Sequence, residues 1–227
     1  WADAGTLVSV SGSWGESENA SANTEGRWEV FLETGVAGGP HQLKISTAVE
    51  EKLLEDILFG EVWLCGGQSN MEWTLGPKVG QGIDNWQTEV ATAEFPQIRF
   101  FDVPHRASVG AGKIGAGSWS ACSPETATTF SAVGYLFGRR LHKELNVPIG
   151  LISCNWGGTV AETWMSPSGV ASHGGFDSDL NRLSEMTPAD AWGLQALQDR
   201  WWKKLDNANA VMPITRGVVA LPSKWSG

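Results

Sequence analysis

The N-terminal quarter of the chain alternates apolar and polar residues. The alternation is clearest in residues 5–14 and 26–35, and a period of two is typical of half-buried β-strands. Between them, residues 15–26 are polar and bounded by glycines, which predicts an exposed loop. Residues 37–47 predict a turn followed by a third strand. We therefore expect a small antiparallel β-domain over residues 1–60.

The pattern changes after this first part. Short, nearly continuous apolar runs in residues 61–65, 97–103 and 149–156 are typical of strands that are covered on both faces. Residues 130–146 space their apolar side chains three and four apart, which predicts a helix. Strand and helix thus alternate, and this order predicts a parallel sheet of the α/β class.

Two further segments complete the pattern. Residues 188–205 predict a last helix, with Thr187 as its N-cap and Pro188 in its first turn. Residues 211–227 contain β-like patches and predict the start of a further β segment. We assign residues 61–210 to the α/β domain.

Composition narrows the classes of function. The 227 residues are 41% hydrophobic and 18% charged, which is typical of a globular protein. The net charge of −9 argues against nucleic acid and anionic membranes as partners, because both would repel the chain. The three cysteines form no CxxC pair, which argues against a zinc site or a redox dithiol. We expect no metal and no cofactor. Thirteen tryptophans suit either a β-rich core or a surface on which sugar rings stack.

The first apolar run of the α/β domain ends on paired glycines and a serine, in the sequence WLCGGQSNMEW. A serine on a tight turn at the carboxyl end of a parallel strand lies where open α/β sheets bind ligands, and Gly66 and Gly67 give the turn steric freedom. The GxSxG motif of many hydrolases is not matched, because Met71 stands in the place of its second glycine. Two interpretations remain: Ser69 is a nucleophile, or Ser69 or Asn70 caps the next helix.

A second strand ends in the same way, in PIGLISCNWGGTVAETW. Backbone N–H groups at Gly157 and Gly158 could donate to a developing oxyanion, which is the stabilisation that acyl transfer needs most. The same residues also suit an ordinary turn between a strand and a helix, with Thr159 as the N-cap. The two interpretations are compatible.

These motifs together resemble the sialate O-acetylesterase family, a group of SGNH-type hydrolases. WLCGGQSNMEW resembles the family's nucleophile block, and PIGLISCNWGGTVAETWMS resembles its later glycine block. The N-terminal sequence GRWEVFLETGVAGGPHQLKI is similar to the family's β-domain, and residues 117–146 are similar to the run between the two blocks. The resemblance covers most of the chain, in order. It implies a flavodoxin-like, three-layer parallel sheet, incomplete in this chain, after a small antiparallel β-domain.

The resemblance also implies roles for individual residues. Ser69 matches the nucleophile, whose own N–H contributes to the oxyanion hole, and Gly157 matches the glycine that supplies the second donor. Gly158 shapes the same turn, and we expect Gln68 and Asn70 to shape the substrate pocket. No metal is implied.

The family's Asp-x-x-His pair, which supplies the general base, has no match in its expected place. We therefore expect the base to come from a C-terminal remainder of the same protein, either a second chain or a further segment. Asp102 and His105 have the same spacing, but they follow the predicted second strand, so we interpret them as part of a solvated loop. His41, His142 and His173 are interpreted as structural, with His173 in a Gly-Ser loop.

The resulting hypothesis is a serine esterase that removes O-acetyl groups from sugars, either acetylated sialic acid or plant polysaccharide, through an acyl-enzyme intermediate. The chain begins at Trp1 rather than at methionine, which suits a removed leader or a trimmed sequence, and we expect a secreted, periplasmic or lysosomal protein. The main alternative is a β-rich module that binds carbohydrate without chemistry. A third is a structural half of a two-chain protein, in which Ser69 is vestigial.

Overall fold

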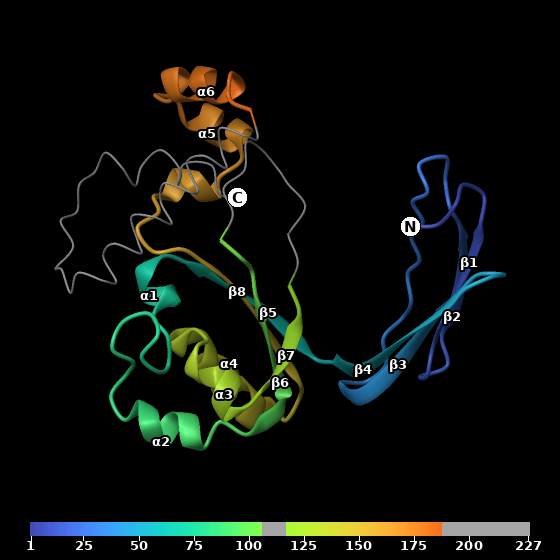
Figure 1. Cartoon of the computed structure of the whole chain (residues 1–227), viewed down its shortest axis with the longest axis horizontal. Coiled ribbons are helices and arrows are strands. Elements are labelled where there is room, and N and C mark those ends of the chain that lie inside the picture. Colours follow the sequence, from blue (N-terminus) through green and yellow to red (C-terminus); the bar gives the residue numbers. More distant parts are fainter. Residues whose placement is uncertain (106–116, 188–227) are drawn as a thin grey trace.

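The computed structural model describes residues 1–105 and 117–187, which contain two four-stranded sheets joined by a short connection (Figure 1). The fold is therefore of mixed α and β structure. The predicted helix at residues 188–205 and the β segment at 211–227 lie outside the described residues. Among the described residues, no helix is long and apolar enough to cross a membrane.

The first sheet is antiparallel, with strand order β2-β1-β3-β4. Its strands are β1 (Leu7–Gly12), β2 (Ser17–Ser21), β3 (Gly38–Ser46) and β4 (Glu51–Phe59). The second sheet has strand order β5-β8-β6-β7. It consists of β5 (Glu61–Gly67), β6 (Phe95–Asp102), β7 (Trp119–Cys122) and β8 (Ile149–Asn155). β5, β8 and β6 run parallel, as the alternating pattern predicted, and β7 pairs antiparallel at one edge.

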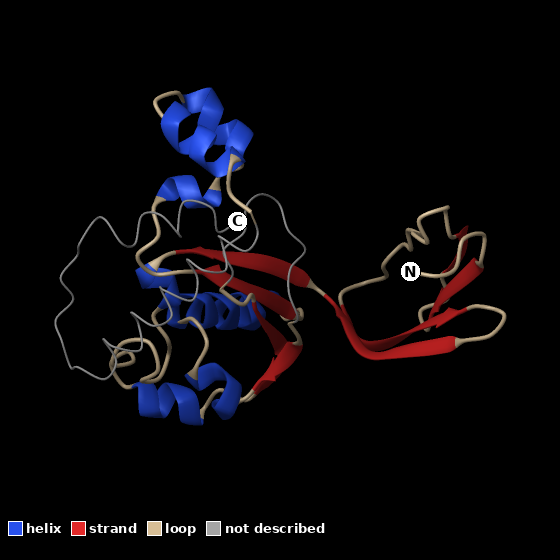
Figure 2. Ribbon diagram, turned by 45° about the horizontal axis from the view of Figure 1, so that its top comes forward, coloured by secondary structure: helices blue, strands red, loops and turns tan. Residues whose placement is uncertain are grey.

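The helices of the described residues are short, apart from one. They are α1 (Ser69–Glu72), α2 (Trp86–Ala91), α3 (Pro124–Thr128), α4 (Ala132–Leu145), the 3-10 helix η1 (Ala161–Trp164), α5 (Pro167–His173) and α6 (Asp177–Ser184). α2, α3 and α4 lie together on one side of the second sheet, whereas α5 and α6 lie apart from them (Figure 2). The three-layer arrangement stays a prediction, as do the domain boundaries.

The N-terminal sequence prediction was wrong in two places. Residues 17–21, predicted as loop, form β2, whereas residues 26–35, predicted as a strand, form none. The reason is a tight turn after β1, in which the Gly12 N–H donates to the Glu16 carbonyl at 2.8 Å. This turn returns the chain at once, so the polar residues pair as an exposed edge strand, a place where polar side chains are favoured. β4 has no counterpart in the prediction.

The core lies between α4 and the second sheet. Ser131 caps α4 by accepting the Gly134 N–H at 3.2 Å, and Asn146 ends the helix in a left-handed conformation. Glycines on the sheet side of α4 permit close packing: a Cβ at position 138 would lie 2.6 Å from Leu151. The centre of the core is made of large buried side chains: Leu75, Ile98, Phe100, Phe130, Tyr135, Ile149 and Leu151.

One residue, Gly60, connects the two sheets, because β4 ends at Phe59 and β5 begins at Glu61. The Glu61 N–H donates to the Pro148 carbonyl at 3.0 Å. A Cβ at position 60 would overlap that carbonyl oxygen. Only glycine therefore fits where the chain passes from one sheet to the other.

Candidate active site

Ser69 lies at the carboxyl end of the parallel sheet, as the sequence predicted. It is the first residue of α1, two positions after the end of β5, and its side chain is exposed. The N-cap of α1 is Gln68, and no side chain makes a cap hydrogen bond there. Neither Ser69 nor Asn70 is therefore needed to cap the helix, and the hydroxyl of Ser69 is left available for other chemistry.

Gly157 lies directly beside Ser69. β5 and β8 are neighbouring parallel strands in which Gly67 pairs with Asn155, so the two loops that follow them begin at the same level. A Cβ added to Gly157 would be 3.4 Å from Ser69 Oγ and 3.5 Å from Ser69 Cα. The sequence motifs at the two strand ends thus meet in space. Gly158 follows, exposed and with φ of 78°.

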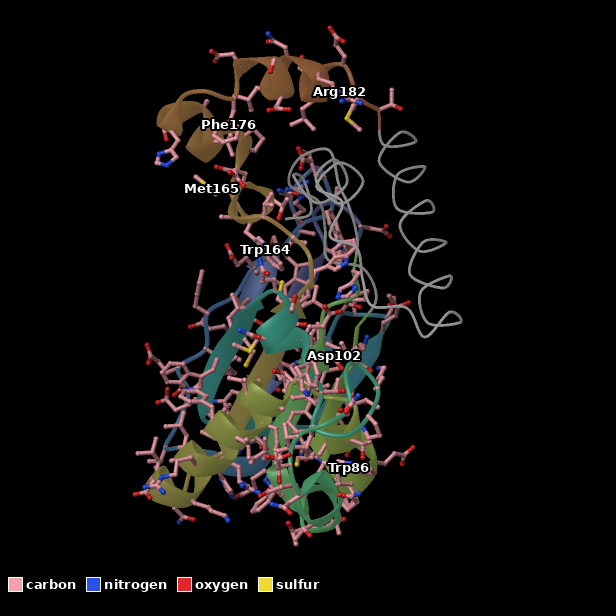
Figure 3. All side chains as sticks on the ribbon, turned by 90° about the vertical axis from the view of Figure 1, so that its left-hand side faces the viewer. Trp86, Asp102, Trp164, Met165, Phe176 and Arg182 are labelled. Atoms are coloured by element: carbon pink, nitrogen blue, oxygen red, sulfur yellow. The ribbon has the colours of Figure 1, made fainter. Side chains whose placement is uncertain are left out.

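Hydrogen bonds tie the two loops together. Gln68 donates its side-chain amide to the Thr159 carbonyl at 2.7 Å. The buried Thr159 hydroxyl donates to the Trp156 carbonyl at 2.7 Å and accepts the indole N–H of Trp164 at 2.9 Å. The prediction of Thr159 as an N-cap is wrong, because Val160 occupies that position before η1 and the Thr159 hydroxyl closes the loop instead. Trp164 and Met165 follow on the segment toward α5 (Figure 3).

Glu72, which the sequence analysis did not select, also lies in this site. One of its carboxylate oxygens, Oε2, accepts the Gly157 N–H, the group predicted as the second oxyanion donor. The other, Oε1, is 3.6 Å from His105 Nε2. The signal in the sequence was the spacing: Glu72 follows Ser69 by three residues, which places both on the same face of a helical turn.

His105 lies at the edge of the site. Its ring stacks on Trp156, with centroids 4.5 Å apart and an angle of 6° between the planes. Its Nε2 is 2.8 Å from the Asn155 carbonyl. A carbonyl can only accept, so Nε2 carries the proton and a neutral His105 has its lone pair on Nδ1. Within the described residues, the Ser69 hydroxyl forms no hydrogen bond to a histidine.

Asp102 ends β6, near the carboxyl edge of the same sheet (Figure 3). Partial burial raises the pKa of its carboxyl group, and a hydrogen bond from the Ser153 side chain opposes that shift. In the described part of the chain, no hydrogen bond joins Asp102 to His105, although the two groups interact electrostatically. Residues 1–105 and 117–187 thus contain no hydrogen-bonded Asp–His dyad of the kind that orients a general base.

The remaining histidines have structural surroundings. His41 stacks on Phe59 with ring centroids 4.3 Å apart, and His142, on α4 as predicted, has Nδ1 2.8 Å from the Val147 carbonyl. His173 was predicted in a loop, but it is the last residue of the helix α5. The helix forms here because Ser166 caps its start by accepting the Gly169 N–H. In the ranges 1–105 and 117–187 no three His, Cys, Asp or Glu side chains are grouped as a metal site.

Comparisons with known proteins agree with the motifs. Over 160 residues the chain is 35% identical to a sialate O-acetylesterase of Rattus norvegicus, and over 152 residues it is 36% identical to that of Homo sapiens. Each match covers 61% of this chain but only 27% and 28% of the two relatives. The crystal structure of a carbohydrate acetylesterase from Xanthomonas citri superposes with a TM-score of 0.71 at 35% identity, over 75% of this chain and 38% of that one.

No family model matches the chain. The chain spans about a quarter of the length of the curated relatives. Within that part, the resemblance to sialate O-acetylesterases is confirmed, and so is the similarity to a carbohydrate acetylesterase fold.

Proposed function

We propose that this chain carries the nucleophile of an SGNH-type serine esterase that removes O-acetyl groups from carbohydrates. One observation carries the proposal: Ser69 is exposed at the end of β5, with Gly157 packed against it. The names of the related proteins, sialate O-acetylesterase and carbohydrate acetylesterase, support the same substrate class.

The proposed reaction begins with attack of Ser69 Oγ on the acetyl carbonyl carbon, while a base accepts the hydroxyl proton. The backbone N–H groups of Ser69 and Gly157 stabilise the oxyanion that forms on the carbonyl oxygen. The bond from carbon to the sugar oxygen then breaks, the sugar oxygen takes the proton, and acetyl-Ser69 remains. Water attacks this ester, releases acetate and restores the hydroxyl.

Glu72 has to leave the Gly157 N–H before the oxyanion can bind there. Its carboxylate oxygen accepts the hydrogen bond that the acetyl oxygen would need. We therefore place the acetyl oxygen at the position that Glu72 Oε2 occupies in the free protein. The loops around this position contain three further residues of the proposed pocket: Gln68, Asn70 and Gly158.

The base is proposed to be a histidine from polypeptide other than these 227 residues, in agreement with the small share of the relatives that the chain spans. His105 is the alternative inside the chain, because it lies 3.6 Å from Glu72. The Nε2–H of His105 donates to the Asn155 carbonyl. In the described residues, its Nδ1 has no hydrogen bond with a carboxylate. The proposed location is secreted, periplasmic or lysosomal.

The test is labelling and turnover by the Ser69→Ala variant. A fluorophosphonate reacts only with an activated serine, so we expect the protein with its full natural continuation to be labelled at Ser69. Ser69→Ala should abolish labelling and lower acetate release from an acetylated xylan oligosaccharide by about 10³-fold or more. Ser172→Ala, which changes an exposed serine on α5, should leave both unchanged.

Three outcomes would contradict the proposal or a part of it. If the complete protein releases acetate and Ser69→Ala releases it equally well, Ser69 is not the nucleophile. If the 227-residue chain alone shows full turnover, the base lies within it and His105→Ala should then remove activity. A non-catalytic carbohydrate-binding module would give no labelling and no turnover in any form.

A further inference from the structure

A cavity of about 470 Å³ lies between the two sheets, at the opposite end of the second sheet from Ser69. It is bounded by the end of β4 and by the first residues of β5, β6 and β8. Its volume is in the range of small-molecule sites. β5 is seven residues long, so the cavity is roughly 20 Å from Ser69 along the strand.

Trp119, on β7, forms an aromatic wall of this cavity. Leu151 packs against α4, so its neighbour Gly150 faces the opposite side of the sheet, and Trp119 lies on that side. A Cβ at position 150 would be 3.3 Å from both the Trp119 ring and Val62. Glycine thus leaves room for the indole against the strand, and Trp119 stays 47% exposed. A large, flat apolar surface is held in place there and remains open to a ligand.

Arg99 and Asp56 form the polar wall. Two guanidinium nitrogens of Arg99 donate to the two Asp56 oxygens at 2.6 and 2.8 Å, and Arg99 Nε donates to the Pro96 carbonyl at 2.8 Å. Asp56 has φ of 59° within a register irregularity of β3 and β4, a backbone conformation that is uncommon for a residue other than glycine. An irregularity of this kind turns a side chain toward a new direction, and here the Asp56 carboxylate meets Arg99 at the cavity.

The charges of the lining disfavour an anionic ligand. The lining holds three carboxylates, of Glu55, Asp56 and Glu61, against one cation, Arg99, so an anion is repelled. Asp56 is paired with Arg99, and Glu55 accepts the Gln42 side-chain amide at 3.0 Å. The wall still offers donors, since the guanidinium has five N–H groups and Gln97 adds an amide, together with an acceptor at Glu61.

We propose that this cavity is a second carbohydrate-binding site, separate from the esterase site, and that it takes a neutral saccharide. A sugar ring presents an apolar C–H face, which would stack on Trp119, and hydroxyl groups that both donate and accept, which would meet Arg99, Gln97 and Glu61. An anionic sugar such as sialic acid is disfavoured by the carboxylates. The site would hold an unacetylated part of a polysaccharide while Ser69 acts elsewhere.

The experiment is an NMR titration of the ¹⁵N-labelled chain, with the Trp119 indole signal assigned from a Trp119→Phe variant. Xylotetraose, which is neutral and carries no acetyl group, should shift the Trp119 indole and Arg99 Nε signals in a saturable way, with a dissociation constant of about 1 mM or tighter. Sialic acid and spermine at the same concentrations should not. Ser69→Ala should bind xylotetraose unchanged, so failure of the esterase proposal would leave this result intact.

Variants locate the binding. Trp119→Ala should weaken binding by roughly tenfold or more, and Gly150→Ala should weaken it without removing the indole, because the added methyl group crowds Trp119. Trp63→Ala is the matched control: Trp63 is 42% exposed, but it makes an edge-to-face contact with Phe137 of α4, on the other face of the sheet. Absence of saturable shifts at Trp119, or equal loss of binding in Trp63→Ala, would overturn the proposal. Saturation by spermine with loss at high salt would assign the cavity to cations instead.

Discussion

At the scale of single residues, the position of Glu72 shows how crowded the candidate site is. A carboxylate oxygen, a serine hydroxyl and the α-carbon of Gly157 share a few ångströms of space. The Gly157 N–H donates to a negatively charged oxygen even in the free protein. An oxyanion in the proposed reaction would also carry negative charge. The Gly157 N–H therefore already points in the direction that an oxyanion requires.

Gly157→Ala should therefore damage activity more than stability. The new Cβ would lie 2.6 Å from Glu72 Oε2 and 3.4 Å from Ser69 Oγ, where the acetyl group has to fit. We expect acetate release by the complete protein to fall by about 10²-fold. Measurements of kcat/KM and of urea unfolding would separate the two effects.

Gly66→Ala is the control for that variant, because Gly66 lies near the end of β5, the strand that leads to Ser69. Its added Cβ would meet only the Cys154 carbonyl, at 3.6 Å, an ordinary contact. Activity close to that of the unchanged protein is expected. An equal loss in both variants would mean that any bulk near the turn is harmful and that Gly157 has no special place.

The three cysteines should differ in reactivity. All three are free, Cys65 and Cys122 are buried, and Cys154 is partly exposed. Burial raises the pKa of each thiol, that of Cys122 to about 11. Since only the thiolate reacts, and a raised pKa lowers its fraction at pH 8, iodoacetamide should modify Cys154 first and Cys122 only on unfolding. Mass spectrometry of timed samples checks this order, and early modification of Cys122 would show that the β7 edge opens.

At the scale of elements, the site is a consequence of how β5 and β8 pair. Parallel strands in register bring their carboxyl ends to one edge, and the loops that follow are joined by the bond between Gln68 and Thr159. The cavity also depends on the arrangement of strands. The edge strand β7 positions Trp119 beside it, and the irregularity in β4 positions Asp56.

The connection between β4 and β5 is expected to be sensitive to substitution. Gly60→Ala would force a methyl group into the Pro148 carbonyl, and backbone atoms cannot move aside as a flexible side chain can. We expect the free energy of unfolding to fall by about 3 kcal/mol. Gly35→Ala, which has open space around its Cβ, should change it by about 0.5 kcal/mol or less. Urea denaturation measures both, and equal stability of the two variants would contradict the close approach.

At the scale of the whole molecule, the sequence predicted those features that depend on local pattern and on the convergence of parallel strands. Ser69 and Gly157 come together because each ends an apolar run of the same sheet. The contacts of Glu72 and of Trp119 could not be predicted, because they depend on which strands are neighbours and on which face each residue lies. The exchange of strand and loop between residues 17 and 35 had a similar cause: alternation alone does not say whether a partner strand is present.

The single glycine between the sheets also limits how this protein can be recombined with its relatives. β4 continues into β5 without a linker, so the antiparallel sheet cannot be exchanged as an independent module. A chimaera that takes residues 1–59 from a related protein must keep Gly60 and its close contact with the Pro148 carbonyl. Without that contact, the angle between β4 and β5 would change, and β5 would carry the change to the position of Ser69.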